Sequence, residues 1–122
     1  MLMSERDALD VLKAAFTSSV SGDAPDLTAR QSAILMVVAL EPGPHTVRGL
    51  AIRLDLAKPV ITRAVDRLES LGLVQRLSDE RDLRSIFIER TEAGTKFLRA
   101  LAKPICNVSP RTRRAPKVAK AA

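Results

Sequence analysis

The chain has 122 residues, a formal net charge of +6, three phenylalanines and no tyrosine or tryptophan. This length fits one folded domain with room for a short additional segment. The scarcity of aromatic side chains argues against an aromatic-lined ligand pocket and against single-strand recognition by base stacking. A single cysteine and a single histidine exclude an intramolecular disulfide and a thiolate zinc cluster, so we expect no metal and no cofactor.

The positive charge is concentrated at the C-terminal end of the sequence. Residues 1–102 contain 14 basic and 14 acidic residues, so their charges cancel. Residues 103–122 contain no acidic residue and six basic ones: Lys103, Arg111, Arg113, Arg114, Lys117 and Lys120. We therefore expect a folded domain over 1–102 and a basic tail over 103–122. The tail lacks apolar periodicity and is expected to be disordered without a partner.

The sequence also predicts a cellular compartment. The first residues lack the basic and apolar regions of a signal peptide. The longest apolar run, residues 33–40, is too short to cross a bilayer. We expect a cytoplasmic protein with no membrane partner.

Ser4 is a suitable N-cap for a first helix that runs to about Thr17. Its apolar residues recur at helical spacing and form a broad stripe: Ala8, Leu9, Val11, Leu12, Ala15 and Phe16. Residues 18–26 are rich in Ser, Gly, Asp and Pro, which predicts a loop.

Thr28 is the expected cap of a second helix that runs to about Leu40. Its apolar run alone could also be a buried strand, but the length and the cap favour a buried helix. Pro42 and Pro44 prevent it from continuing.

Thr46 then caps a short third helix, from Val47 to about Leu54. Residues 55–57 are a short turn, and a fourth helix begins with Pro59 at its first position, where a missing N–H costs little. It ends before Gly72, which suits the left-handed position after a helix. Two short helices joined in this way predict a helix-turn-helix.

The fourth helix is amphipathic. At about 100° per residue, its apolar side chains fall within an arc of roughly 140°; they are Val60, Ile61, Ala64, Val65, Leu68 and Leu71. The outward residues are Pro59, Thr62, Arg63, Asp66, Arg67 and Ser70. Such a face suits a helix whose N-terminal part reaches base edges in the DNA major groove. DNA phosphates would repel Asp66, so we favour a role in pinning Arg63 or Arg67.

A β-hairpin and a last helix complete the domain. The predicted strands are Leu73–Leu77 and Ser85–Glu89, with a charged turn between them. The last helix runs from Ala93 to about Ala102, and Pro104 is expected to stop it. The fold class is therefore mainly α with a small β-hairpin wing, a winged helix-turn-helix.

In this order, the segments resemble the MarR family of bacterial winged-helix regulators. The resembling segments, between Leu27 and Leu101, are LTARQSAIL, TVRGLAIRL, VITRAVDRLESLGLVQR, DERDLRS and TEAG. The most diagnostic is DxRDxR, formed by Asp79, Arg81, Asp82 and Arg84. The resemblance implies that the helix over 59–71 lies in the major groove and that the wing tip enters the minor groove.

The resemblance implies DNA contacts from Lys58, Thr62, Arg63 and Arg67 in the helix and from Arg81 and Arg84 in the wing. It also implies that the wing acids orient these arginines by ion pairing. Pro59 belongs to the same candidate surface.

Two further contacts are expected from the chemistry of the residues. The free N–H groups at the helix start beside Thr46 and Arg48 suit a phosphate. In the tail, Arg113 and Arg114 are expected to follow the DNA backbone.

Family members usually dimerise through long helices at both ends, and some hold an effector beside that interface. The broad apolar stripe of the first helix favours a homodimer here. The predicted end helices are short and aromatic residues are few, so the sequence leaves a small-molecule effector uncertain.

No catalytic constellation is visible, so an enzyme is not expected. His45 has no second ligand residue nearby for a metal, and Cys106 is expected to be an unstructured thiol. The favoured function is a sequence-specific, double-stranded DNA-binding transcriptional regulator in the cytoplasm, at the nucleoid. Two alternatives stay open: a nucleoid-associated architectural protein with weak sequence preference, and a winged-helix protein-interaction adaptor.

Overall fold

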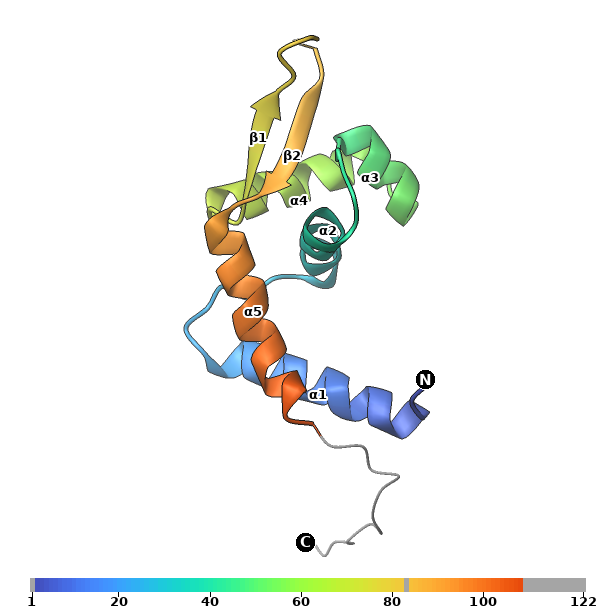
Figure 1. Ribbon diagram of the computed structural model, residues 1–122, viewed down its shortest axis with the longest axis vertical. Helices are drawn as coiled ribbons and strands as arrows, with labels where there is room; N and C mark the ends of the chain where they lie inside the picture. The colour runs from blue at the N-terminus through green and yellow to red at the C-terminus, as the bar shows by residue number, and fades with distance from the viewer. Residues whose placement is uncertain (1, 83, 109–122) are drawn as a thin grey trace, which may run out of the picture. The chain divides into compact units, whose positions relative to one another are not determined.

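The computed structural model describes residues 2–82 and 84–108, and within them seven elements follow one another (Figure 1). They are the helices α1 (Glu5–Ser21), α2 (Ala29–Leu40), α3 (Val47–Leu54), α4 (Lys58–Ser70) and α5 (Glu92–Cys106), and the strands β1 (Val74–Ser78) and β2 (Ile86–Arg90). This confirms the predicted fold class. Most of the predicted tail, including Arg113 and Arg114, lies outside the described residues.

The predicted caps of the first three helices are confirmed. Ser4 Oγ accepts a hydrogen bond from the Asp7 N–H at 3.0 Å, and Thr46 Oγ1 accepts one from the Gly49 N–H at 3.0 Å. Thr28 and Gln31 form a reciprocal capping box, with hydrogen bonds of 3.1 and 3.0 Å. Each cap accepts a hydrogen bond from a backbone N–H that has no partner within the helix. A cap of this kind stabilises a protein by about 1 kcal/mol.

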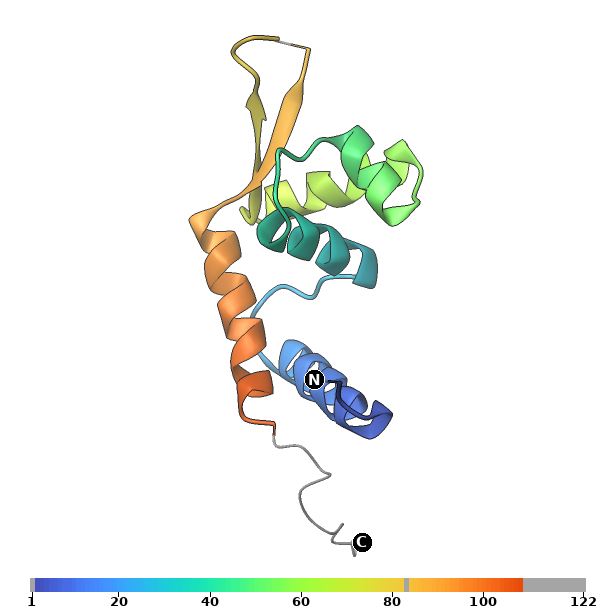
Figure 2. The ribbon, with the colours of Figure 1, turned by 45° about the vertical axis from the view of Figure 1, so that its right-hand side comes forward.

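Residues 25–99 form one compact unit, whose apolar core joins α2, α3, α4 and the hairpin. The buried core residues are Ile34, Leu35, Val37, Val38, Leu50, Ile61, Ala64, Val65, Leu68, Leu73, Val74 and Ile88. The predicted second helix is therefore helical and buried, and the predicted apolar arc of α4 faces the core. Figures 1 and 2 show that the hairpin projects beyond these three helices.

The end of α4 explains why β1 begins one residue later than predicted. Gly72 adopts a left-handed φ of 77° as expected, and its N–H donates to the Glu69 carbonyl at 2.9 Å. The Leu73 N–H donates to the Leu68 carbonyl at 2.9 Å. Leu73 thus completes the helix end instead of joining the sheet. At the other end, α4 begins at Lys58, so Pro59 occupies its second position.

The two strands pair antiparallel, with Leu77 opposite Phe87. A contact that the sequence did not indicate lies on the other side of β2, where His45 forms a bridge to Ile88. The Ile88 N–H donates to the His45 carbonyl at 2.8 Å. The loop before α3 is therefore attached to the hairpin.

Thr91 closes the base of the hairpin. Its N–H donates to the Leu73 carbonyl at 3.1 Å, and its Oγ1 donates to the Gly72 carbonyl at 2.6 Å. The same Oγ1 accepts from the Gly94 N–H at 3.0 Å, which caps α5. Gly94 is buried against the Leu73 carbonyl so closely that a β-carbon there would collide with it. The end of α4 and the start of α5 are therefore joined at one point.

Within the described residues, the second compact unit comprises 2–24 and 100–108, and α1 is its main element. The prediction that α1 ends near Thr17 was wrong, since the helix continues to Ser21. Thr17 Oγ1 donates to the Lys13 carbonyl at 2.7 Å, and Ser21 Oγ donates to the Ser18 carbonyl at 3.4 Å. Hydroxyls that bond back to the preceding turn are satisfied within a helix, so composition alone misplaced this boundary.

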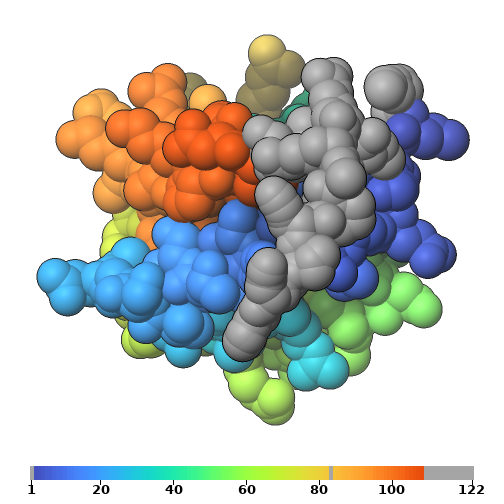
Figure 3. All heavy atoms as spheres, turned by 90° about the horizontal axis from the view of Figure 1, so that it is seen from below, coloured from blue at the N-terminus to red at the C-terminus, as the bar shows by residue number. Residues whose placement is uncertain are grey.

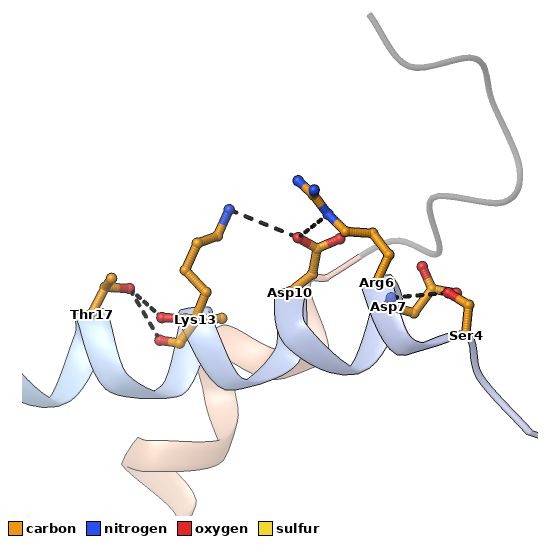
Figure 4. Close-up of polar contacts among 7 residues, drawn as sticks. Ser4, Arg6, Asp7, Asp10, Lys13 and Thr17 are labelled. Atoms are coloured by element: carbon orange, nitrogen blue, oxygen red, sulfur yellow. Dashed lines mark hydrogen bonds and ion pairs between the residues drawn. The ribbon is translucent and has the colours of Figure 1, made fainter. Parts of the chain in front are cut away.

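Two stripes run along α1. One is polar: Asp10 lies between Arg6, at 3.5 Å, and Lys13, at 3.8 Å (Figure 4). The other is apolar and consists of Leu9, Leu12, Phe16 and Val20, each at least 49% exposed. Figure 3 shows α1 in blue beside the red end of α5.

The prediction that Pro104 stops the last helix was also wrong. Helix α5 continues through Pro104 to Cys106, so this cysteine is the exposed last residue of a helix rather than part of an unstructured tail. A proline within a helix removes one hydrogen bond. Leu101, Pro104 and Ile105 are half-buried along one side of α5.

Candidate nucleic-acid interface

The outward face of α4 carries the predicted helix residues. Arg63 and Arg67 are exposed along it, and Lys58 and Pro59 are exposed at its N-terminal end. Thr62 is half-buried and therefore less accessible than predicted. The structure brings these residues onto one side of a single helix, opposite the face that packs against α2 and α3 in the core.

The turn before α4 fixes its direction relative to α3. Asp55 ends α3 in the left-handed conformation, with a φ of 55°, and its N–H donates to the α3 carbonyls of Ala51 and Ile52. Ala57 precedes α4 in extended conformation. This arrangement of two packed helices joined by a tight turn is the predicted helix-turn-helix.

An ion pair holds α3 to the end of α2. Arg53 donates from Nε to Glu41 Oε1 at 2.9 Å and from Nη2 to Glu41 Oε2 at 2.7 Å. The hydrogen bond from Arg53 is the main cause that lowers the pKa of Glu41 below its ordinary value. Arg48 is exposed in the first turn of α3, next to Thr46, whose Oγ1 serves as the helix cap. Phosphate binding by these two residues stays a prediction.

The wing tip is organised by two carboxylates. Asp79 Oδ1 accepts from the Arg81 N–H at 2.9 Å, and Asp82 Oδ1 accepts from the Arg84 N–H at 3.0 Å. The Ser85 N–H donates to the Asp82 carbonyl at 2.8 Å. Aspartates that bond the amide two residues further on are common turn formers.

The implied role of the wing acids is therefore only partly correct. Asp82 approaches Arg84 Nε at 3.5 Å, but the Arg84 side chain is 94% exposed. Within the described residues, no ion pair is recorded for the exposed Arg81 side chain. The acids mainly shape the backbone of the turn, and both arginine side chains extend into solvent.

The prediction that Asp66 pins Arg63 or Arg67 was wrong. Asp66 instead accepts from Arg76 Nη2 of β1 at 2.7 Å, and Glu69 accepts from Arg76 Nη1 at 2.5 Å. Burial by itself would lower the pKa of Arg76. The hydrogen bonds to Asp66 and Glu69 outweigh that effect and raise the pKa above its ordinary value. The role of Arg76 was not predicted, although its position two residues after Val74 puts both side chains on the same side of the strand.

The described part of the chain contains no cluster of three or more His, Cys, Asp or Glu side chains suited to a metal ion. His45 Nε2 lies 2.9 Å from the Glu41 carbonyl oxygen. Among the same residues, no helix has the length and apolar character needed to cross a membrane.

A helix-turn-helix followed by a hairpin with arginines at its tip defines the winged-helix class of DNA-binding domains. A sequence profile of the MarR family matches residues 26–85 of this chain. This agrees with the resemblance that the motifs indicated.

A curated relative is the transcriptional regulator HosA of Escherichia coli O157:H7. It is 36% identical over 81 residues, which are 66% of this chain and 58% of HosA. The matched region thus spans less than two thirds of that relative.

Two solved structures have the same fold. CouR from Rhodococcus jostii RHA1, bound to p-coumaroyl-CoA, has a TM-score of 0.62 at 27% identity, covering 84% of this chain and 70% of CouR. The F27L mutant of S. aureus MepR, bound to an oligodeoxyribonucleotide, has a TM-score of 0.61 at 20% identity. That match covers 78% of this chain and 67% of MepR.

Proposed function

We propose that this protein is a sequence-specific, double-stranded DNA-binding transcriptional regulator and not an enzyme. One observation carries the proposal: the outward face of α4, with Arg63 and Arg67, belongs to the same compact unit as a wing whose Arg81 and Arg84 extend into solvent. The names of the relatives favour this function over an architectural nucleoid protein or a protein-interaction adaptor.

In this proposal, α4 enters the major groove and the wing tip lies at the minor groove. Arg63 and Arg67 reach base edges or nearby phosphates, while Lys58 contacts the backbone near the start of α4. An arginine can donate two hydrogen bonds to a guanine edge, which is a common specific contact. Arg48, beside the α3 N-terminus, contacts a phosphate.

The test begins with selection of duplexes from a random-sequence pool by the full chain. We expect the pool to yield one preferred sequence. The double substitution Arg63→Ala, Arg84→Ala should weaken binding to that sequence by about a hundredfold, since each lost charged contact costs about tenfold in affinity. Fluorescence anisotropy measures the dissociation constant.

The matched control is Lys96→Ala with Arg99→Ala, which removes two exposed cations from α5 and changes the net charge equally. We expect this variant to bind nearly as tightly as the unaltered protein. Equal losses in both variants would indicate binding by net charge alone. A pool that yields no preferred duplex would refute the specific regulator.

We also propose that the protein is a homodimer. The apolar stripe of α1 is exposed along its length, and exposed apolar patches of this kind mark interaction surfaces. A symmetric dimer would prefer a pseudo-palindromic site with half-sites about 10 bp apart. Footprints confined to one half-site at every protein concentration would contradict the dimer.

The remaining partners follow from the same proposal. The cations of residues 109–122 bind the DNA backbone without sequence preference, which places the protein on chromosomal DNA at the nucleoid. The proposal leaves open whether a small-molecule effector binds; CouR holds p-coumaroyl-CoA in its structure.

A further inference from the structure

Arg76 differs from the other basic residues near the candidate interface. It lies opposite Ile88 in the hairpin and on the same side of β1 as Val74, and both of these neighbours are buried in the core. Its side chain is only 24% exposed, whereas that of Arg84 at the wing tip is 94% exposed. Arg76 is therefore fitted against other protein groups and is not extended toward solvent.

The partners of Arg76 are the two acidic residues of α4. Asp66 and Glu69 are three positions apart, which puts them on neighbouring parts of the helix surface. The guanidinium bonds one carboxylate with each terminal nitrogen, at 2.7 Å and 2.5 Å. We call these three residues the Arg76 cluster. It connects β1 to α4 beyond the core contacts of Val74 and Ile88.

This connection matters because a winged helix uses two separate DNA contacts. The outward face of α4 and the wing tip must fit two grooves at once, so the angle between hairpin and helix has to be fixed. Single exposed ion pairs contribute little to stability. One half-buried arginine bonded to two carboxylates restricts this angle more than a single pair, since a planar guanidinium bonds them in fixed directions.

We propose that Arg76 is a positioning residue, which holds the wing at the angle to α4 that lets both contact DNA together. This inference rests on the proposed function. Arg76 itself contacts Asp66 and Glu69, not DNA. Its loss therefore removes the contribution of the wing while the wing arginines are still present.

A double-mutant cycle between Arg76 and the wing tests this. The full chain and its Arg76→Met, Arg84→Ala and doubly substituted forms are titrated with a fluorescein-labelled duplex, selected from a random pool by the unaltered protein. Arg84→Ala should weaken binding about tenfold in the unaltered protein, as expected for one charged contact. In the Arg76→Met background it should weaken binding less than about twofold, because the effects of coupled residues do not add.

Equal losses from Arg84→Ala in both backgrounds would overturn the inference, because Arg76 and the wing would then act independently. No loss in either background would overturn it as well, since the wing would have no contact to position. These outcomes differ from failure of the proposed function, in which the unaltered protein selects no duplex at all.

A second variant separates positioning from charge. Asp66→Ala with Glu69→Ala removes the partners of Arg76 and also two negative charges from α4. If the acids only repelled phosphates, binding would tighten, and this result would overturn the inference. The Arg76 cluster instead predicts about tenfold weaker binding. Arg99→Met on α5 serves as the control, and thermal unfolding followed by circular dichroism verifies that every variant is folded.

Discussion

At the scale of single residues, hydrogen bonds between side chains and the backbone fix the wing turn and the base of the hairpin. The carboxylates of Asp79 and Asp82 accept hydrogen bonds from backbone N–H groups two residues further on and thereby shape the wing turn. Thr91 joins Gly72 and Leu73 to the start of α5. Gly94 lets that junction form, because any side chain there would meet the Leu73 carbonyl.

Gly94→Ala is therefore expected to destabilise the protein. The added methyl collides with backbone, which cannot move aside as a flexible side chain can, and overpacking of this kind costs about 1–3 kcal/mol or more. Urea denaturation measures the free energy of unfolding. Gly22→Ala is the matched control, because its methyl would meet its nearest neighbour at 3.7 Å, an ordinary contact distance. Equal stability of the two variants would contradict this account of the junction.

The sequence predicted residue roles well where the signal was local. Caps at Ser4, Thr28 and Thr46 and the left-handed Gly72 depend on neighbours within a few positions, and all four are confirmed. The partner of Asp66 lies ten positions away on a strand, and helical spacing cannot reveal it. For the same reason, the bridge from His45 to Ile88 was not predicted.

At the scale of elements, α1 has more apolar surface than its own packing uses. The exposed stripe of Leu9, Leu12, Phe16 and Val20 lies next to the polar stripe centred on Asp10. Helices α1 and α5 were both predicted to end too early, because Ser, Thr and Pro residues in a sequence suggest helix ends. Hydroxyl bonds to the preceding turn and apolar packing allow these residues inside a helix.

Leu12→Glu with Phe16→Glu is expected to convert the proposed dimer to a monomer, since charged groups would be buried at the interface. Sedimentation velocity measures the molecular mass in solution. Thr17→Glu is a control on the neighbouring polar stripe and should leave the dimer intact. Sedimentation of the unaltered protein as a monomer at all concentrations would contradict the proposed homodimer.

The Glu41–Arg53 pair links α2 to α3 and predicts a dependence on pH. The hydrogen bond from Arg53 holds the pKa of Glu41 below its ordinary value of 4.5. The stabilisation is therefore complete above pH 4.5 and is lost as the pH falls through the lowered pKa. The difference in unfolding free energy between the unaltered protein and Glu41→Gln should shrink over that acid range. A constant difference would indicate that the carboxylate is not the relevant group.

At the scale of the whole molecule, the excess positive charge and the residues proposed to read the DNA sequence lie in different parts of the chain. Residues 1–102 balance their charges, and residues 103–122 hold the excess of six. The five basic residues of α4 and of the wing turn, residues 79–84, are offset by five acids in the same two segments, two of them in the Arg76 cluster. We expect the specific contacts and the general attraction to DNA to be separable.

A chain ending at Val108 tests this separation, because it lacks five basic residues of the tail. Each phosphate contact contributes about 0.9 to the slope of log K against log salt, so the slope should become shallower by about four. The sequence preference in a random pool should stay the same. Anisotropy titrations at several salt concentrations measure the slope, and an unchanged slope would show that the tail does not contact the DNA backbone.

The closed base of the hairpin has a consequence for how such a protein can diversify. Because Thr91 bonds back to Gly72 and Leu73, the strands leave and re-enter the helical scaffold at almost the same place. Residues can be added or removed at the distal turn without shifting the helices, since both ends of the loop are already tied. The reach of the wing can therefore change independently of the framework that carries it.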